Sequence, residues 1–247
     1  MTAPVALVTG GSSGIGEALA RRLRARGYEV LLSARGHERL SAAAEAMGAR
    51  ALPADVSDPL GRDALVAAVR GVGRLDLLVN NAGAAGGTTA LDIDVDRARR
   101  VLEVNFYAHL ALTRALWPLL AEASGCIVNV SSVYGTYAAD GSAGYCASKH
   151  ALTAWSRALA AAARPLGVRV LTVNPGPVAT ATFPHDELRA DPLRRRLVLE
   201  AGQCADDVLR ALDAGRGEIW TRRIFRLPAI AQALAPGTFT RFFSGRL

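Results

Sequence analysis

Short apolar runs alternate with longer amphipathic stretches along the first 180 residues of the chain. The runs are rich in Val, Leu and Ile and have the length of buried strands, while the stretches between them have helical spacing. The predicted strands cover residues 5–8, 28–33, 49–53, 75–80, 126–130 and 168–173. The predicted helices cover residues 17–26, 38–47, 59–70, 95–123 in two segments, and 144–164. This alternation predicts an α/β fold, a doubly wound parallel sheet in a three-layer α/β/α arrangement.

The pattern weakens after residue 180. Residues 181–203 are polar, contain two prolines and are predicted to form a lid over a substrate site. Residues 205–214 are predicted to be a helix and residues 218–221 a last strand. For the C-terminal extension, residues 224–247, packing on the sheet is favoured, while a subunit contact or a membrane-surface contact stays open. No linker interrupts the chain, so we expect one domain over residues 1–247.

Composition narrows the functional classes. Hydrophobic residues make up 51% of the 247 residues, which suits a globular core. The net charge of +7 is interleaved with acidic residues, so a basic enzyme surface is favoured and no nucleic-acid partner is expected. Lys149 is the single lysine among 29 basic residues, which makes it a candidate for chemistry.

The cysteines and the N-terminus favour a cytoplasmic protein. Cys126, Cys146 and Cys204 lie far apart without metal-ligand spacing, so we expect reduced thiols and no metal site. The chain passes from Met1 almost directly into an apolar strand, which leaves no room for a signal peptide. No apolar run has the length of an integral membrane segment.

A glycine-rich turn joins the first predicted strand to the first predicted helix. Its glycines have the spacing Thr-Gly-x-x-x-Gly-x-Gly. Glycines allow a tight turn and close backbone approach, and amides at a helix N-terminus attract phosphate. The turn is therefore predicted to bind the pyrophosphate of a dinucleotide. Its predicted contacts are Gly10, Ser12, Ser13, Gly14, Ile15 and Gly16.

This spacing, together with later motifs in the same order, resembles the short-chain dehydrogenase/reductase family in its short single-domain branch. The resemblance runs over residues 9–180 and implies a Rossmann-like fold that binds a nicotinamide dinucleotide at the carboxyl ends of the strands. The further cofactor contacts that it implies are Asp55, Val56, Asn81, Ala82, Gly83, Tyr145, Lys149, Pro175, Gly176, Val178 and Thr180.

Arg35 indicates which dinucleotide is used. An acid at the end of the second strand would bond the ribose 2′-hydroxyl and repel a 2′-phosphate. This chain has Ser33-Ala34-Arg35-Gly36 there, without an acid. An arginine makes charge-assisted hydrogen bonds to phosphate, and in the family an arginine so placed goes with the phosphorylated dinucleotide. We therefore expect NADP(H), with Arg35 at its 2′-phosphate.

Tyr145 and Lys149 are four residues apart on the long predicted helix and therefore share one face. A phenol is a weak base at neutral pH, and a nearby ammonium lowers its pKa toward that of a general acid/base. The resemblance implies that Ser132 orients the substrate oxygen and that Asn105 helps to hold a water in the proton relay behind the lysine. Asn105, Ser132, Tyr145 and Lys149 are the predicted catalytic residues.

Together these residues predict an NADP(H)-dependent oxidoreductase that transfers hydride between nicotinamide and a carbonyl or alcohol substrate. The favoured substrate is a hydrophobic ketone or aldehyde, because the candidate pocket residues are apolar or aromatic. They are Tyr134, Tyr137, Phe183, Leu188 and Leu197.

Three alternatives remain open at this point. The nearest is a 3-oxoacyl-carrier-protein or polyketide-type ketoreductase, although Ala123 and Leu166 stand where such enzymes tend to carry basic residues. The others are a non-catalytic NADP-binding sensor or scaffold, and a sugar-nucleotide epimerase or dehydratase of the longer branch. The resemblance also implies a homodimer or homotetramer assembled through the long helices.

Overall fold

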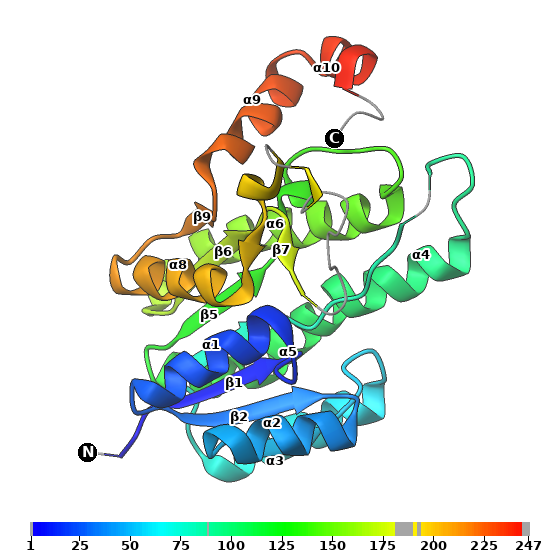
Figure 1. The fold of residues 1–247 in the computed structure, drawn as a ribbon. Coiled ribbons are helices and arrows are strands. Elements are labelled where there is room, and N and C mark those ends of the chain that lie inside the picture. Colours follow the sequence, from blue (N-terminus) through cyan, green and yellow to red (C-terminus); the bar gives the residue numbers. More distant parts are fainter. Residues whose placement is uncertain (1, 88, 181–189, 192–193, 244–247) are drawn as a thin grey trace.

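Seven parallel strands form the central sheet of the computed structural model, which describes all residues except 1, 88, 181–189, 192–193 and 244–247. The strands are β1 (Val5–Thr9), β2 (Glu29–Ala34), β3 (Arg50–Pro53), β4 (Leu77–Asn80), β5 (Cys126–Val130), β6 (Arg169–Asn174) and β9 (Glu218–Trp220). Their order across the sheet is β3-β2-β1-β4-β5-β6-β9. The strand order therefore reverses between β1 and β4, as in a doubly wound fold. The predicted Rossmann-like α/β fold is confirmed (Figure 1).

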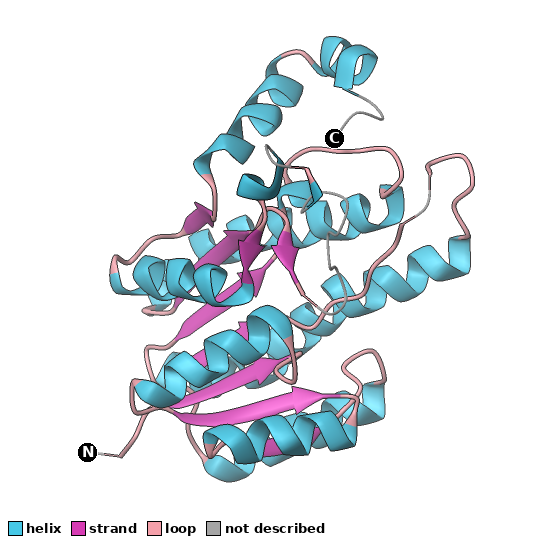
Figure 2. Cartoon of the chain, viewed as in Figure 1, coloured by secondary structure: helices cyan, strands magenta, loops and turns pink. Residues whose placement is uncertain are grey.

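Helices cover both faces of this sheet (Figure 2). On one face lie α1 (Gly14–Ala25), α2 (His37–Met47) and α8 (Ala201–Asp213); on the other lie α3 (Pro59–Val72), α5 (Ala108–Glu122) and α6 (Ala143–Ala163). Strand β1 shows how the layers arise: Ala6 and Val8 enter one core, while Val5 and Leu7 enter the other. Successive side chains of a strand point to opposite faces, and both faces are covered here, so the strands are continuous apolar runs.

A π-helical turn interrupts the long helical stretch after β4. α4 (Val95–Leu102) leads into the π-helix Glu103–Tyr107, and α5 follows directly. Two helical segments within residues 95–123 are thereby confirmed. The periodicity of apolar residues does not reveal the π turn, which carries Asn105. Such turns are frequent at functional sites.

The chain beyond β6 departs most from its prediction. β7 (Val178–Ala179) pairs with β8 (Leu199–Glu200) in a small parallel sheet, and α8 begins directly after β8. Residues 199–203 of the predicted lid belong to β8 and to the start of α8. Residues 181–189 and 192–193 lie outside the described residues, and the lid stays a prediction.

The C-terminal extension forms an arm that rises from the body of the fold (Figure 1). It consists of the 3₁₀ turn Arg223–Phe225, α9 (Arg226–Leu234) and α10 (Pro236–Phe243). Phe239 of α10 is 5% exposed and packs with Val133 and Tyr137. The arm packs on the segments that follow β5 and β6, at the ends of the strands, and the favoured packing on the sheet stays a prediction for the extension as a whole. We call residues 223–243 the C-terminal arm.

Candidate active site

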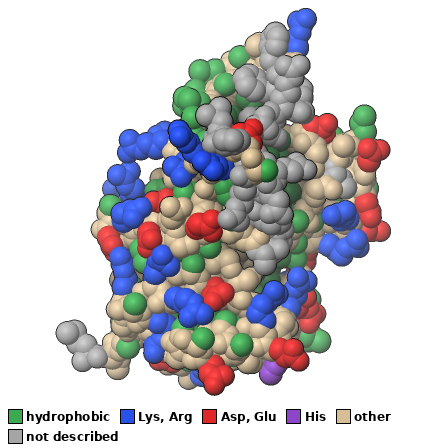
Figure 3. Space-filling view, in the orientation of Figure 1, with side chains coloured by type: hydrophobic (Ala, Val, Ile, Leu, Met, Phe, Trp, Pro, Cys, Tyr) green, Lys and Arg blue, Asp and Glu red, His purple; other side chains and the backbone are tan. Residues whose placement is uncertain are grey.

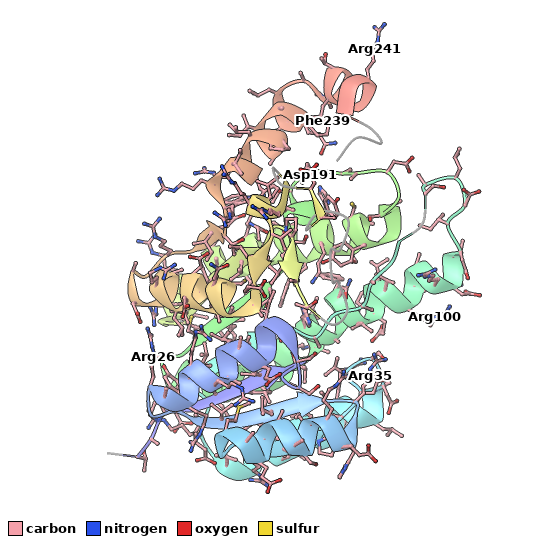
Figure 4. The ribbon with its side chains drawn as sticks, viewed as in Figure 1. Arg26, Arg35, Arg100, Asp191, Phe239 and Arg241 are labelled. Atoms are coloured by element: carbon pink, nitrogen blue, oxygen red, sulfur yellow. The ribbon has the colours of Figure 1, made fainter. Side chains whose placement is uncertain are left out.

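The predicted site residues gather at the carboxyl ends of the strands. Gly10 follows β1, Arg35 follows β2, Asn81 follows β4 and Ser132 follows β5 closely. Open α/β sheets bind ligands at this edge, beside the point where the strand order reverses. In Figure 4, Arg35 extends from this edge of the sheet.

The turn between β1 and α1 has a backbone suited to glycine. Gly10 and Gly14 have φ angles of +64° and +58°, in the left-handed region. A Cβ on Gly16 would lie 2.4 Å from the Gly10 carbonyl oxygen. Ser13 stands at the N-cap of α1, but its side chain makes no capping hydrogen bond within the described chain. The first amides of α1 therefore remain available to an anion.

Thr9 and Asn81 hold this turn against the end of β4. The Thr9 hydroxyl donates to the Val79 carbonyl at 3.1 Å and accepts from the amides of Asn81 and Ala82. The Asn81 side chain donates to the carbonyls of Thr9 and Gly10. Thr9 was not predicted as a residue that shapes the site. Its signal in the sequence is a hydroxyl at the end of an otherwise apolar strand, and the structure shows it fully buried.

Other predicted contacts support the turn by packing. Ser12 and Val56 are buried, and Val56 lies in the core between the sheet and α3. Ile15 packs with Val178 of β7. A Cβ on Gly83 would lie 3.4 Å from Asn105 Oδ1, so the absence of a side chain allows this close approach.

Arg35 and Asp55 face each other at the ends of β2 and β3. The Arg35 side chain is 72% exposed, and its Nη1 lies 4.0 Å from Asp55 Oδ2. Burial raises the pKa of Asp55, but hydrogen bonds from Ser57 and the charges of Arg35 and Arg62 together hold it below its usual value. Because the ion pair is long and exposed, Arg35 can leave Asp55 and bind a phosphate with little loss of free energy.

The segment after β6, residues 175–180, contacts the turn after β5 and the glycine turn. The Pro175 carbonyl accepts from the Val133 amide, and the Gly176 amide donates to Thr221 Oγ1. A Cβ on Gly14 would lie 2.9 Å from the Thr180 methyl carbon, which places Thr180 directly against the glycine turn.

Tyr145 and Ser132 form the polar centre of the site. Ser132 begins the 3₁₀ turn Val133–Gly135, and its hydroxyl is hydrogen-bonded to the Tyr145 phenol. Burial raises the pKa of Tyr145 to about 12, and the Ser132 hydrogen bond opposes that rise. The Tyr134 ring packs edge-on against the Tyr145 ring at 6.4 Å between centroids. In the chain alone the phenol pKa is thus raised, and the expected lowering by Lys149 is not seen.

Lys149 lies one helical turn further along α6 and is 3% exposed. Its Nζ donates to the Val130 carbonyl at 2.9 Å and lies 5.8 Å from the centroid of the Tyr145 ring. Burial lowers the pKa of Lys149 to about 7. The ammonium is therefore close enough to interact with Tyr145, while its nearest acceptor is a backbone carbonyl.

Asn105 connects three elements around this centre. Its Oδ1 accepts from the Ala84 amide at 2.7 Å, and its Nδ2 donates to the Ala84 carbonyl and to Ser148 Oγ. Ser148 in turn donates to the Tyr145 carbonyl. The side chain of Asn105 is fully engaged in positioning, so its backbone is the part left for the water that the resemblance implies.

His109, on the helix that follows the π turn, was not predicted. It is fully buried, and its Nε2 lies 2.9 Å from the Ala82 carbonyl oxygen. Because that partner can only accept, Nε2 carries the proton. Its Nδ1 has no hydrogen-bond partner among the described residues. Burial, reinforced by the charge of Lys149, lowers the pKa of His109 to about 3.

A cluster of aromatic side chains packs beside Tyr145. Tyr134 and Tyr137 pack edge-on at 5.6 Å between centroids, and Phe239 of the C-terminal arm lies 6.3 Å from Tyr137. Phe239 was not predicted, since nothing in its local sequence pattern shows where α10 folds back. Phe183 and Leu188, predicted as pocket residues, lie outside the described residues, and Leu197 belongs to a 3₁₀ turn before β8.

The residues at this edge fit a nicotinamide dinucleotide. The uncapped amides at the start of α1 can hold its pyrophosphate, and Arg35 can hold a phosphate on its ribose. Within the described part of the chain, no group of three His, Cys, Asp or Glu side chains is placed to hold a metal ion. None of the described helices combines the length and the apolar composition that a bilayer crossing requires.

Comparison with known proteins identifies the family. The family model for short chain dehydrogenase matches residues 4–190, so the chain belongs to that family. This is a family of oxidoreductases that act on CH–OH or C=O groups and bind a nicotinamide cofactor.

Individual relatives and structures agree with this assignment. An uncharacterized oxidoreductase of Staphylococcus epidermidis is 35% identical over 212 residues, which cover 84% of this chain and 90% of that protein. The NADPH-dependent 1-acyldihydroxyacetone phosphate reductase of Schizosaccharomyces pombe is 38% identical over 70% of this chain and 60% of its own length. The short-chain dehydrogenase of Sphingobium yanoikuyae, solved in complex with NADPH, has a TM-score of 0.81 at 26% identity, over 99% of this chain and 98% of that chain.

Proposed function

We propose that this protein is an NADP(H)-dependent reductase of apolar ketones or aldehydes, with Tyr145 as general acid/base. The observation that carries the proposal is the hydrogen-bonded Ser132–Tyr145 pair, with Lys149 one turn away, at the strand ends beside the glycine turn. The exposed Arg35 and the two relatives whose names include NADPH support the phosphorylated cofactor.

The mechanism follows from what each side chain can do. When bound, the nicotinamide supplies hydride to the substrate carbon or removes it. Ser132 and Tyr145 offer two hydroxyl donors to one carbonyl oxygen, and Tyr145 passes its proton to that oxygen. In this proposal the Lys149 ammonium, 5.8 Å from the centroid of the Tyr145 ring, stabilises the phenolate that remains after the proton is transferred. Asn105 fixes the helix that carries both residues through Ser148.

Substrate choice is proposed from the lining of the site. The half-buried Tyr134 packs against Tyr145, with the buried Tyr137 and Phe239 behind it, and this aromatic cluster favours an apolar group beside the carbonyl. A carrier-bound acyl chain is the second candidate, because a relative in Streptomyces virginiae, 38% identical over 188 residues, carries a name that includes monensin polyketide synthase and ketoacyl reductase. The three buried free thiols suit a reducing compartment, and we propose the cytoplasm.

The decisive experiment measures loss of NADPH absorbance against aliphatic, aromatic and β-keto carbonyls, with NADH as the alternative cofactor. We expect turnover with NADPH, and its loss by about 10²–10⁴-fold in Tyr145→Phe while NADPH binding remains. Tyr134→Phe is the matched control, because it removes a neighbouring hydroxyl outside the proposed relay. NADPH binding without turnover on any carbonyl would support the sensor alternative, and preference for NADH would contradict the role of Arg35.

We also propose a homodimer, through the groove between α5 and α6. This cavity of about 450 Å³ is lined by apolar side chains, among them Trp117, Trp155 and Leu166. Leu166 is 60% exposed, which a self-complementary contact would cover. Light scattering of Trp117→Glu is expected to give half the mass of the unmodified protein, and an unchanged mass would contradict this interface.

A further inference from the structure

The outer face of α9 carries exposed apolar side chains. Leu227, Ile230 and Leu234 recur at the spacing of one helical face and are 63%, 49% and 81% exposed. Ile224, in the turn before this helix, is 55% exposed. Figure 3 shows hydrophobic side chains gathered over the projecting end of the molecule, with basic side chains beside them. We call these four residues the apolar face of the arm.

The opposite face of the arm is held by the body of the protein. Gln232 Oε1 accepts from the Ala138 amide at 2.8 Å, and Ala229 packs in the cluster around Tyr137. Phe225 packs so closely on Gly176 that a Cβ there would lie 2.3 Å from the ring. The helix is therefore docked on one side, and the apolar face is presented to the outside. A group of large apolar side chains exposed beside charged residues marks an interaction site.

The charge of this segment indicates which kind of partner binds the apolar face of the arm. Residues 219–247 contain five arginines and neither Asp nor Glu. Arg223 and Arg226 are exposed beside the apolar face, and neither pairs with a carboxylate among the described residues. Arg226 stacks over the Trp220 ring at 4.9 Å, which holds its charge at the base of α9.

We propose that the apolar face of the arm docks on an anionic lipid surface. A helix with an apolar face flanked by arginines lies in the plane of a membrane interface, where apolar burial and attraction to anionic headgroups add. A second copy on the same face would bring two sets of arginines together without an acidic residue from either arm, which like-charge repulsion opposes. This inference goes beyond the proposed reductase activity and does not depend on it. Since Phe239 joins the arm to the residues around Tyr145, docking also places the candidate substrate site near the lipid.

The test is co-sedimentation of the full chain with vesicles of phosphatidylglycerol and phosphatidylcholine, compared with phosphatidylcholine alone. We expect binding to the anionic vesicles at about 0.1 M salt, and weaker binding at about 1 M salt. The double variant Leu227→Glu, Ile230→Glu is expected to lose at least about tenfold in affinity. The variants Arg223→Gln and Arg226→Gln are each expected to lose roughly fivefold.

Leu60→Glu is the matched control, because Leu60 is 77% exposed at the start of α3, far from the arm along the sheet. It should bind the anionic vesicles as the unmodified chain does. Circular dichroism and the Tm verify that each variant is folded. Equal vesicle binding by the double variant and the unmodified chain would overturn the proposal, as would no binding to anionic vesicles. A smaller solution mass of the double variant, without vesicle binding, would show instead that a second copy covers this face. Because turnover is not the readout, failure of the reductase proposal would leave this result unaffected.

Discussion

The interior of the sheet and helices that carry the candidate active site, here called the catalytic half, differs from the C-terminal arm in what it buries and what it exposes. Across the sheet, Asn80 Nδ2 donates to Asn129 Oδ1 at 2.8 Å, Asn129 donates to Ser156 at 2.9 Å, and Ser156 lies 2.7 Å from Thr172 Oγ1. This network pairs Asn80 Nδ2, Asn129 and Ser156 within the chain, while Asn80 Oδ1 and His109 Nδ1 have no hydrogen-bond partner among the described residues. In the arm, by contrast, large apolar side chains such as Leu234 face outward. The first region thus buries polar groups in a network within the chain, whereas the second exposes apolar groups, for which we propose a partner outside the chain.

The strongest test of the catalytic half is Lys149→Met. The change removes the ammonium that supports Tyr145, so turnover should fall by about 10²–10⁴-fold. It also removes a buried charge that lowers the free energy of unfolding. Burial lowers the pKa of Lys149 from 10.5 to about 7, because it disfavours the charged form. The unfolded chain therefore binds more protons between those values, and stability rises with pH there. Met fills a similar volume without that cost, so near pH 7 we expect a higher Tm, by about 2–4 °C per kcal/mol gained.

Activity assays and calorimetry at pH 7 and pH 9 check both parts of this prediction. The gain in Tm should shrink at the higher pH, since the unmodified protein gains stability as Lys149 loses its proton. A lower Tm in the variant would show that the bond to the Val130 carbonyl outweighs the burial of charge.

The same comparison explains how far the sequence predicts the structure. The parallel sheet, the glycine turn and the Ser132–Tyr145–Lys149 cluster follow from residue types at fixed spacing, because each requirement is local or repeats along strands. The π turn at Asn105 could not be predicted, since a single inserted residue hardly changes the apolar periodicity. The position of Phe239 could not be predicted either. Its partner Tyr137 is distant in the sequence, and no sequence pattern links the two residues.

Arg35→Gln tests the cofactor side of the site. The charge-assisted bonds to a 2′-phosphate disappear, so the KM for NADPH should rise by about 10–100-fold while the KM for NADH stays nearly unchanged. Steady-state kinetics with both cofactors measure this split. Arg39→Gln, an equal change of charge at an exposed position on α2, should leave both values nearly unchanged. A parallel rise for NADPH and NADH would mean that Arg35 acts on the fold of the site and not on the phosphate.

Phe239→Ala probes the contact between the two regions. The side chain is buried, but only in the small cluster between the arm and the segment after β5. We expect the arm to loosen locally, with faster tryptic cleavage in residues 222–226, about a tenfold higher KM for apolar carbonyls, and little change in Tm. Leu112→Ala in the central core is the contrast, since it should cost about 2–5 kcal/mol of global stability. A fall in Tm of similar size in both variants would show that the arm folds as part of the core.

His109 offers the smallest and most specific test of the catalytic half. Burial first, and then the charge of Lys149, lowers its pKa from 6.5 to about 3, so the folded protein keeps this ring neutral where the unfolded chain protonates it. As pH falls from 6.5 toward 3, the unfolded state binds the extra proton, and His109 should cost up to about 1.4 kcal/mol of stability per pH unit. His109→Gln keeps an amide donor for the Ala82 carbonyl but does not titrate, so the stability of the variant relative to the unmodified protein should increase as the pH is lowered. Urea unfolding at pH 7, 6 and 5 measures that difference, with the exposed His37→Gln as control. A constant difference across this range would mean that the pocket around Nδ1 accommodates the proton, and that this part of the interior is less closed than its hydrogen bonds indicate.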